Sequence, residues 1–189
     1  MKLVILALGL TSLVASSATV TINNFNGNID ALTSSGAALQ PGFVGLFNFA
    51  TAPSTPSEFV SNSATSQLGL TTLSASDSFD NGRGTQLSSL IEFDDGEITD
   101  GQTVFVALGE GSDVGSSSTF TLFEFVAQSL PTPPGAQEDF GTLVLDTSSL
   151  VSSSFGTVSG SVLELAPVPE PSASLLAIAS LGLVLRRRR

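Results

Sequence analysis

The sequence contains no cysteine, histidine, tryptophan or tyrosine, and it has only six basic residues in 189. Without cysteine the chain has no disulfide, thiolate nucleophile or Cys-ligated zinc. Without histidine it has no Ser-His-Asp triad and no imidazole base near neutral pH. The length fits one domain with short appendages, at ~100–200 residues per domain. These absences exclude several catalytic chemistries.

The few basic residues are segregated at the two ends of the chain. Five of the six are Lys2 and then Arg186, Arg187, Arg188 and Arg189. Residues 19–168 hold sixteen of the seventeen carboxylates, all except Glu170, and the single arginine Arg83, which gives a formal charge of −15. Such a surface repels phosphate backbones, so we expect no nucleic-acid partner. The acidity indicates solubility in an exported setting.

The N-terminus has the pattern of a secretory signal peptide. Lys2 precedes an apolar run over residues 3–14, and the small residues Ala15, Ser16, Ser17 and Ala18 follow. A positive region, a short apolar region and small side chains at the cleavage position specify such a signal. The run is too short to cross ~30 Å of hydrocarbon as a permanent anchor. We therefore expect export through the secretion translocon and cleavage after Ala18, or else after Ser17.

The C-terminus combines a proline-rich turn, an apolar run and a basic end. Residues 172–185 are uncharged and stop at the arginine cluster, which is held on the cytoplasmic side of a membrane. As a helix this run is about 21 Å long, short of the usual span, although arginine snorkelling and bilayer thinning relieve such a mismatch. We therefore predict a short transmembrane helix that stops translocation. It would leave Arg186, Arg187, Arg188 and Arg189 on the cytoplasmic side of the membrane.

Three C-terminal elements follow one another in an order that is typical of a sorting signal. The run Val168, Pro169, Glu170 and Pro171, a short hydrophobic helix and terminal arginines together resemble the PEP-CTERM sorting signal of Gram-negative bacteria. The resemblance covers residues 167–189. It implies recognition by an exosortase-type membrane peptidase, which processes the chain near the Pro-Glu-Pro motif. It also implies an inner-membrane-tethered precursor and then a place at the cell surface or in the exopolysaccharide matrix.

The body between the two ends shows the pattern of strands and turns, without long helical periodicity. Short alternating or apolar runs are separated by Gly, Asn, Asp, Ser and Pro. In residues 103–108, Val104, Val106 and Leu108 share one face while Phe105 and Ala107 share the other, which indicates a strand covered on both sides. We predict strands over residues 19–24, 42–49, 67–73, 86–93, 103–108, 119–126, 141–146 and 161–165.

About eight strands in this length predict an all-β, antiparallel β-sandwich or jelly-roll-like body over residues 19–166, between a signal helix (1–18) and the sorting signal (167–189). We expect most phenylalanines to form its core. Three stretches rich in Ser, Thr and Pro are interpreted as loops: residues 51–66, 129–135 and 148–161.

The densest polar cluster follows a predicted strand and contains four carboxylates within seven positions: Asp94, Asp95, Glu97 and Asp100. Hard cations such as calcium bind closely spaced oxygen ligands. The spacing differs from that of an EF-hand loop, and an acidic hairpin turn made soluble by its charges is the simpler interpretation. We keep these residues as a candidate calcium site and otherwise expect no cofactor.

We interpret the chain as an exported, non-catalytic protein with a structural or matrix-associated role. Two alternatives stay open. One is a calcium-assisted carbohydrate-binding module that acts on extracellular polysaccharide. The other is a secreted hydrolase that uses a pair of carboxylates. The missing Trp and Tyr, which stack on sugars, and the missing base near neutral pH weigh against a hydrolase.

Overall fold

The computed structural model describes residues 17–25, 27–39, 42–73, 83–133 and 136–168, together with the backbone of residues 78–80. Most of this part of the chain is β-strand, as predicted. Its elements are β1 (Ser17–Asn23), β2 (Ala31–Ser34), β3 (Ala37–Ala38), β4 (Gly42–Phe47), α1 (Pro56–Ser66), β5 (Gln67–Leu73), β6 (Ser78–Asp80), β7 (Thr85–Asp94), β8 (Thr103–Glu110), β9 (Thr119–Val126), β10 (Glu138–Val144), the 3-10 turns η1 (Thr147–Ser149) and η2 (Ser153–Phe155), β11 (Gly156–Ser159) and β12 (Val162–Pro167).

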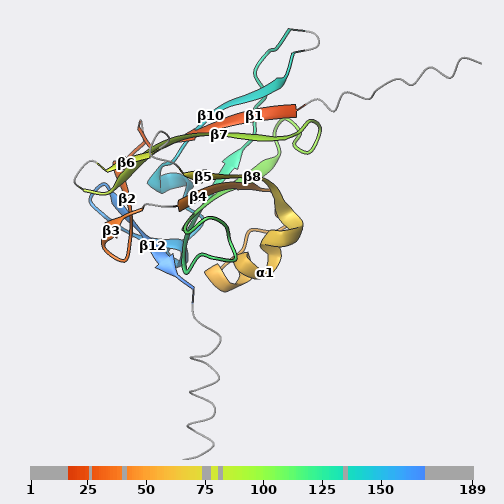
Figure 1. Ribbon diagram of the computed structural model, residues 1–189. Coiled ribbons are helices and arrows are strands. Elements are labelled where there is room, and N and C mark those ends of the chain that lie inside the picture. The colour runs from red at the N-terminus through yellow and green to blue at the C-terminus, as the bar shows by residue number, and fades with distance from the viewer. Residues whose placement is uncertain are drawn as a thin grey trace, which may run out of the picture.

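The strands form one mixed sheet with the order β10-β1-β7-β2-β12-β9-β8-β4-β5. Three further strands lie off this path: β11 pairs with β12, β3 with β2, and β6 with β7. Two junctions along this path are narrow. β2 meets β7 at a single pair, Leu32 with Thr85, and β12 meets β9 over two pairs. The sheet bends at these junctions, so that β4, β5 and β8 lie below β1, β7 and β10 in Figure 1.

The main hydrophobic core lies between these two groups of strands. Apolar residues alternate along each strand, because successive side chains of a strand point to opposite faces. β1 and β7 contribute Val20, Ile22 and Ile91, and β4 and β8 contribute Leu46 and Val106, all nearly or fully buried. On β7, Leu87, Ile91 and Phe93 alternate with less buried residues and form a core face, with Ser89 buried among them.

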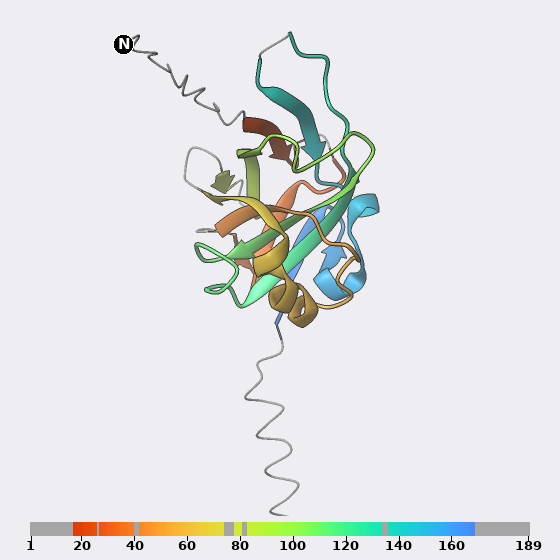
Figure 2. The same ribbon diagram turned by 90° about the vertical axis from the view of Figure 1, so that its right-hand side faces the viewer.

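A second cluster of buried side chains lies on the other face of β4, β8 and β9, and α1 covers it. Figure 1 shows α1 and β1 on opposite sides of β4 and β8, and Figure 2 again places α1 far from β1. The cluster is rich in phenylalanine, with rings from β4 (Phe43, Phe47), the following loop (Phe49), α1 (Phe59), β8 (Phe105), β9 (Phe120) and η2 (Phe155). The predicted two-sided burial of residues 103–108 is therefore confirmed.

Helix α1 corrects the prediction of a loop over residues 51–66. Thr55 is its N-cap and accepts a hydrogen bond from the Glu58 backbone N–H at 3.2 Å, and Pro56 occupies the first turn. Both are favourable at a helix start. The helix forms because Phe59 and Pro56 are buried on one side while the other side stays polar. Composition alone does not indicate this helix, because serine and threonine dominate residues 51–66.

The prediction of a purely antiparallel sheet is also wrong in two places. β1 pairs with β10 in parallel, and β12 pairs with β2 in parallel. Parallel neighbours need a long connection, and in both cases more than 100 residues of chain separate the partners. Short strands β2, β3, β6 and β11 were not predicted, and β11 lies in the expected loop over residues 148–161.

Candidate functional site

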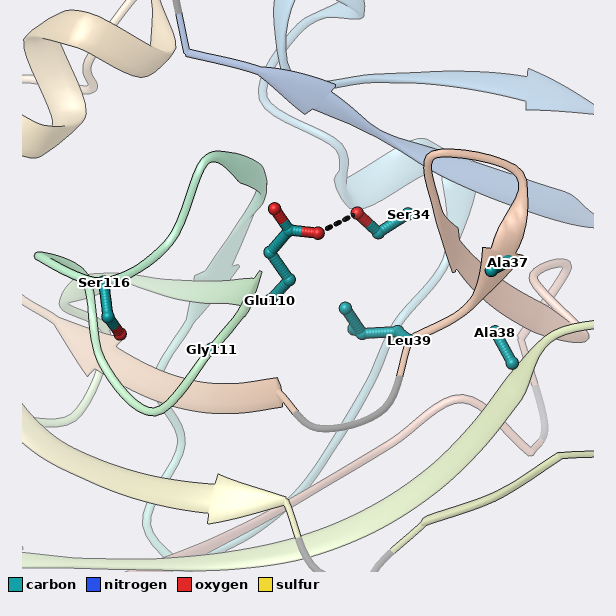
Figure 3. A pocket seen from close by; sticks show the side chains of 7 residues that line it. All are labelled: Ser34, Ala37, Ala38, Leu39, Glu110, Gly111 and Ser116. Atoms are coloured by element: carbon teal, nitrogen blue, oxygen red, sulfur yellow. Dashed lines mark hydrogen bonds between the residues drawn. The ribbon is translucent and has the colours of Figure 1, made fainter.

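A polar cavity of about 390 Å³ lies where the β2–β3 hairpin faces the end of β8. Figure 3 shows Glu110 between the hairpin on one side and the loop after β8 on the other. The residues around the cavity come from these two segments: Ser34, Ala37, Ala38, Leu39, Glu110, Gly111 and Ser116. β2 lies between the two narrow junctions of the sheet and β8 lies beyond the second, so the bend of the sheet brings the hairpin to the end of β8.

Hydroxyl groups from three neighbours hold the Glu110 carboxylate in place. Ser34 Oγ donates to Glu110 Oε2 at 2.6 Å, and Ser118 Oγ donates to Glu110 Oε1. Thr119 Oγ1 lies 2.8 Å from Ser34 Oγ and extends the network into the buried part of β9. The hydrogen bond from Ser118, followed by that from Ser34, lowers the pKa of Glu110 below its usual range, so the group is ionised at neutral pH.

The loop after β8 is fixed by its own hydrogen bonds. Gly111 has φ +87°, a conformation that favours glycine, and its Cα lies close to Ser116. Asp113 Oδ1 accepts a hydrogen bond from the Ser116 backbone N–H at 2.8 Å, and Ser116 Oγ accepts from the Ser112 N–H at 3.2 Å. The wall of the cavity opposite the hairpin is therefore ordered by local turns.

A second carboxylate, Glu164 on β12, supports the other side of the same hairpin. Glu164 Oε1 accepts a hydrogen bond from the Gly36 backbone N–H at 2.9 Å, and Glu164 Oε2 accepts from Thr33 Oγ1. Among the described residues the one ion pair joins Arg83 to Asp30, at 3.4 Å. That pair does not include Glu110, whose described side-chain partners are neutral hydroxyls.

This arrangement is suited to binding more than to general-base chemistry. A carboxylate whose pKa is lowered is a weak base at neutral pH, so Glu110 does little to activate the Ser34 hydroxyl as a nucleophile. Sequence reasoning missed this site, because Ser34 and Glu110 are 76 positions apart and β2 was not predicted. An acidic residue directly after the apolar run of β8 is the one feature that points to it.

The four carboxylates of the candidate calcium site lie on β7 and in the following turn, and all are exposed. Asp100 Oδ1 accepts a hydrogen bond from the Ser129 backbone N–H at 3.0 Å, and Asp95 bonds to Glu138 on β10. Across the part of the chain that the structure describes, no three His, Cys, Asp or Glu side chains are grouped so that they hold a metal ion. Asp94 ends β7, and Asp95, Glu97 and Asp100 lie between β7 and β8.

The contact between Glu138 and Asp95 predicts an unusual pH dependence. The hydrogen bond that protonated Glu138 donates to Asp95, then desolvation and the nearby charges of Asp95 and Asp100, raise the pKa of Glu138. The folded state then holds this proton more tightly than the unfolded state, so the contribution to the free energy of unfolding grows as pH falls from neutral and levels off below the ordinary value of 4.5.

We expect Glu138→Gln to raise the free energy of unfolding near pH 7 by up to about 0.5 kcal/mol, since the exposed pair is strongly screened. Near pH ~3, where the glutamate is protonated in both states, the gain disappears. Urea titrations at both pH values measure the difference. Glu124→Gln, which changes an exposed carboxylate on β9, is the control, and an equal effect of both variants contradicts the assignment.

The structure describes the inner ends of the two predicted processing signals, residues 17–18 and 167–168. Ala18 is fully buried in β1, where it pairs with Phe93 and with Glu138, so cleavage after Ala18 removes the first two residues of that strand. Val168 follows β12, donates its N–H to the Ser118 carbonyl at 2.8 Å and packs on the phenylalanine cluster. These residues therefore make contacts with the body predicted over residues 19–166.

The remaining predicted signal residues lie outside the described residues: Pro169, Glu170, Pro171, Arg186, Arg187, Arg188 and Arg189, with the apolar runs 3–14 and 172–185. Within the described ranges, no helix combines the length and the apolar character needed to cross a bilayer. Comparison of the whole chain with protein-family models, curated proteins and solved structures found no match.

Proposed function

We propose that this chain is an exported, surface-directed protein without catalytic activity, whose tail is a sorting signal for an exosortase-type membrane peptidase. Its working part is the β-rich body, with two groups of strands packed as a β-sandwich. The body has a structural or matrix-associated role at the cell surface. The tail resembles the PEP-CTERM signal through Val168, Pro169, Glu170 and Pro171, followed by an apolar run and four arginines.

One observation supports the proposal: the described β-rich body reaches directly to the Pro-Glu-Pro motif. β12 ends at Pro167, and Val168 still packs on the phenylalanine cluster. The described members of both hydrophobic clusters lie between Ala18 and Val168. The predicted sorting signal therefore follows the last described strand with no separate linker between them in the sequence.

The proposed route follows the order of the chain. Residues 1–18 direct export through the secretion translocon, and the apolar run 172–185 arrests translocation with the arginines inside. Pro169 and Pro171 fix φ and withhold backbone donors, which favours the extended backbone that a peptidase needs. Because β12 ends two residues before Pro169, the motif begins close to the surface of the body.

Deletion of Arg186, Arg187, Arg188 and Arg189 is expected to leave unprocessed or misplaced protein, because the apolar run loses the charges that fix its orientation. Glu170→Ala is expected to block processing and keep the membrane tether. Intact mass spectrometry and cell fractionation in a host with an exosortase-type peptidase measure both effects. For the deletion, a variant with four lysines in place of the arginines keeps the charge and is the matched control. Surface protein that still ends at Arg189 contradicts the proposal.

A further inference from the structure

We propose that the Glu110 cavity binds an organic cation, through an ammonium or guanidinium group placed beside the Glu110 carboxylate. The site lies in the body, between the β2–β3 hairpin and the loop after β8, and does not depend on the predicted sorting signal. Three properties of the cavity support this ligand class: its size, its charge and the arrangement of its polar atoms.

The size of the cavity fits a small organic group. Its volume of about 390 Å³ is within the range of ~300–1,000 Å³ that is usual for small-molecule sites. A bare metal ion is a poorer match: among the described residues, Glu110 is the one carboxylate that lines the cavity, and no three metal-ligating side chains are grouped together. Leu39 and Ala38 add an apolar surface that suits the carbon skeleton of an organic ligand.

The charge of the cavity selects a cation. Glu110 is ionised, and the side chains that bond to it in the structure, Ser34 and Ser118, are neutral donors. Glu164 adds a second negative charge behind the same hairpin, where it bonds to Thr33 and Gly36. Residues 19–168 carry one arginine against sixteen carboxylates, so the surrounding field also attracts positive ligands.

The Glu110 carboxylate is oriented by neutral donors. The hydroxyls of Ser34 and Ser118 donate to its two oxygens, and the Ser118 backbone N–H and the Thr119 hydroxyl add to this set. These donors position the carboxylate but bring no positive charge. An ammonium or guanidinium group adds that charge and forms charge-assisted hydrogen bonds with the carboxylate oxygens.

Calorimetric titration of the full chain in a mild neutral detergent tests the site. Glucosamine and N-acetylglucosamine share one ring and differ in charge at the amino group. We expect glucosamine to bind at least about tenfold more tightly, because its ammonium adds a charge–charge attraction to the Glu110 carboxylate that the neutral acetamide lacks. Nα-acetyl-lysinamide carries an ammonium group on a peptide-like frame. Tighter binding of glucosamine identifies an amino sugar as the ligand, and tighter binding of Nα-acetyl-lysinamide identifies a protein side chain.

Glu110→Gln is expected to weaken the binding of the cation about tenfold or more, while Glu124→Gln, which changes an exposed carboxylate of β9 outside the cavity wall, alters it less than about twofold. Ala37→Arg places a cation of the chain's own at the exposed rim and is expected to abolish binding while Glu110 is kept, which covers the case in which Glu110→Gln does not fold. Equal binding of the two sugars, absence of binding by both cations, or unchanged affinity in Ala37→Arg overturns the proposal.

Discussion

Replacement of Phe59 by alanine is expected to lower the free energy of unfolding by about 3–5 kcal/mol, the usual cost of this change in a packed core. Phe59 is fully buried on α1, and its ring centroid lies 5.1 Å from those of Phe47 and Phe120 and 5.9 Å from that of Phe49. Three of its ring contacts are edge-to-face, a favourable geometry for aromatic pairs. The side chain anchors the helix to the sheet, so its loss removes both apolar contacts and ring pairs.

Urea denaturation of the full chain, followed by circular dichroism, measures the change. Ser61→Ala is the control, because Ser61 lies on the exposed side of the same helix and bonds only to the Ser57 carbonyl. We expect Ser61→Ala to stay within about 0.5 kcal/mol of the parent protein. A Phe59→Ala variant as stable as Ser61→Ala contradicts the packing of α1 on the phenylalanine cluster.

The strands were predictable because burial imposes a period of two on the sequence. Residues 67–73 and 119–126 were predicted with the bounds of β5 and β9, and the other six predicted strands overlap observed ones. β7 is the clearest case, since buried and less buried residues alternate along its whole length, whereas β8 was recognised as an apolar run covered on both faces. Short strands such as β3, with two residues, are too brief to show a period.

The features that were missed depend on contacts between distant segments. Helix α1 carries a local signal, Thr55 as N-cap with Pro56 in the first turn and Glu58 after them, but its apolar side shows only when the phenylalanines of β4 and β9 are placed beneath it. The Glu110 site depends on β2, whose four residues are all buried and do not alternate with polar ones. No local pattern relates Ser34 to Glu110, so the bend of the sheet alone brings them together.

A methyl group added at Gly69 is expected to destabilise the fold by about 1–3 kcal/mol, the usual cost of overpacking. A Cβ on Gly69 of β5 would lie 2.5 Å from Ile91 Cγ2 and 2.8 Å from the Glu92 carbonyl oxygen of β7. A side chain can rotate away, but a strand carbonyl cannot move without a shift of the backbone. β5 and β7 lie at separate places along the hydrogen-bonded path of the sheet, so this close approach exists only because the sheet bends over itself.

Gly69→Ala therefore tests the bend of the sheet directly. Urea titration measures the free energy of unfolding of the variant. Gly115→Ala is the matched control. Gly115 is exposed, and a Cβ there would meet only Asp113 Oδ1, at an ordinary contact distance of 3.4 Å. Because neither glycine has a positive φ, backbone strain is the same for both, and the difference between the variants measures steric overlap alone. Equal stabilities of the two variants would contradict the packing of β5 against β7. They would also contradict a main core enclosed between the two groups of strands.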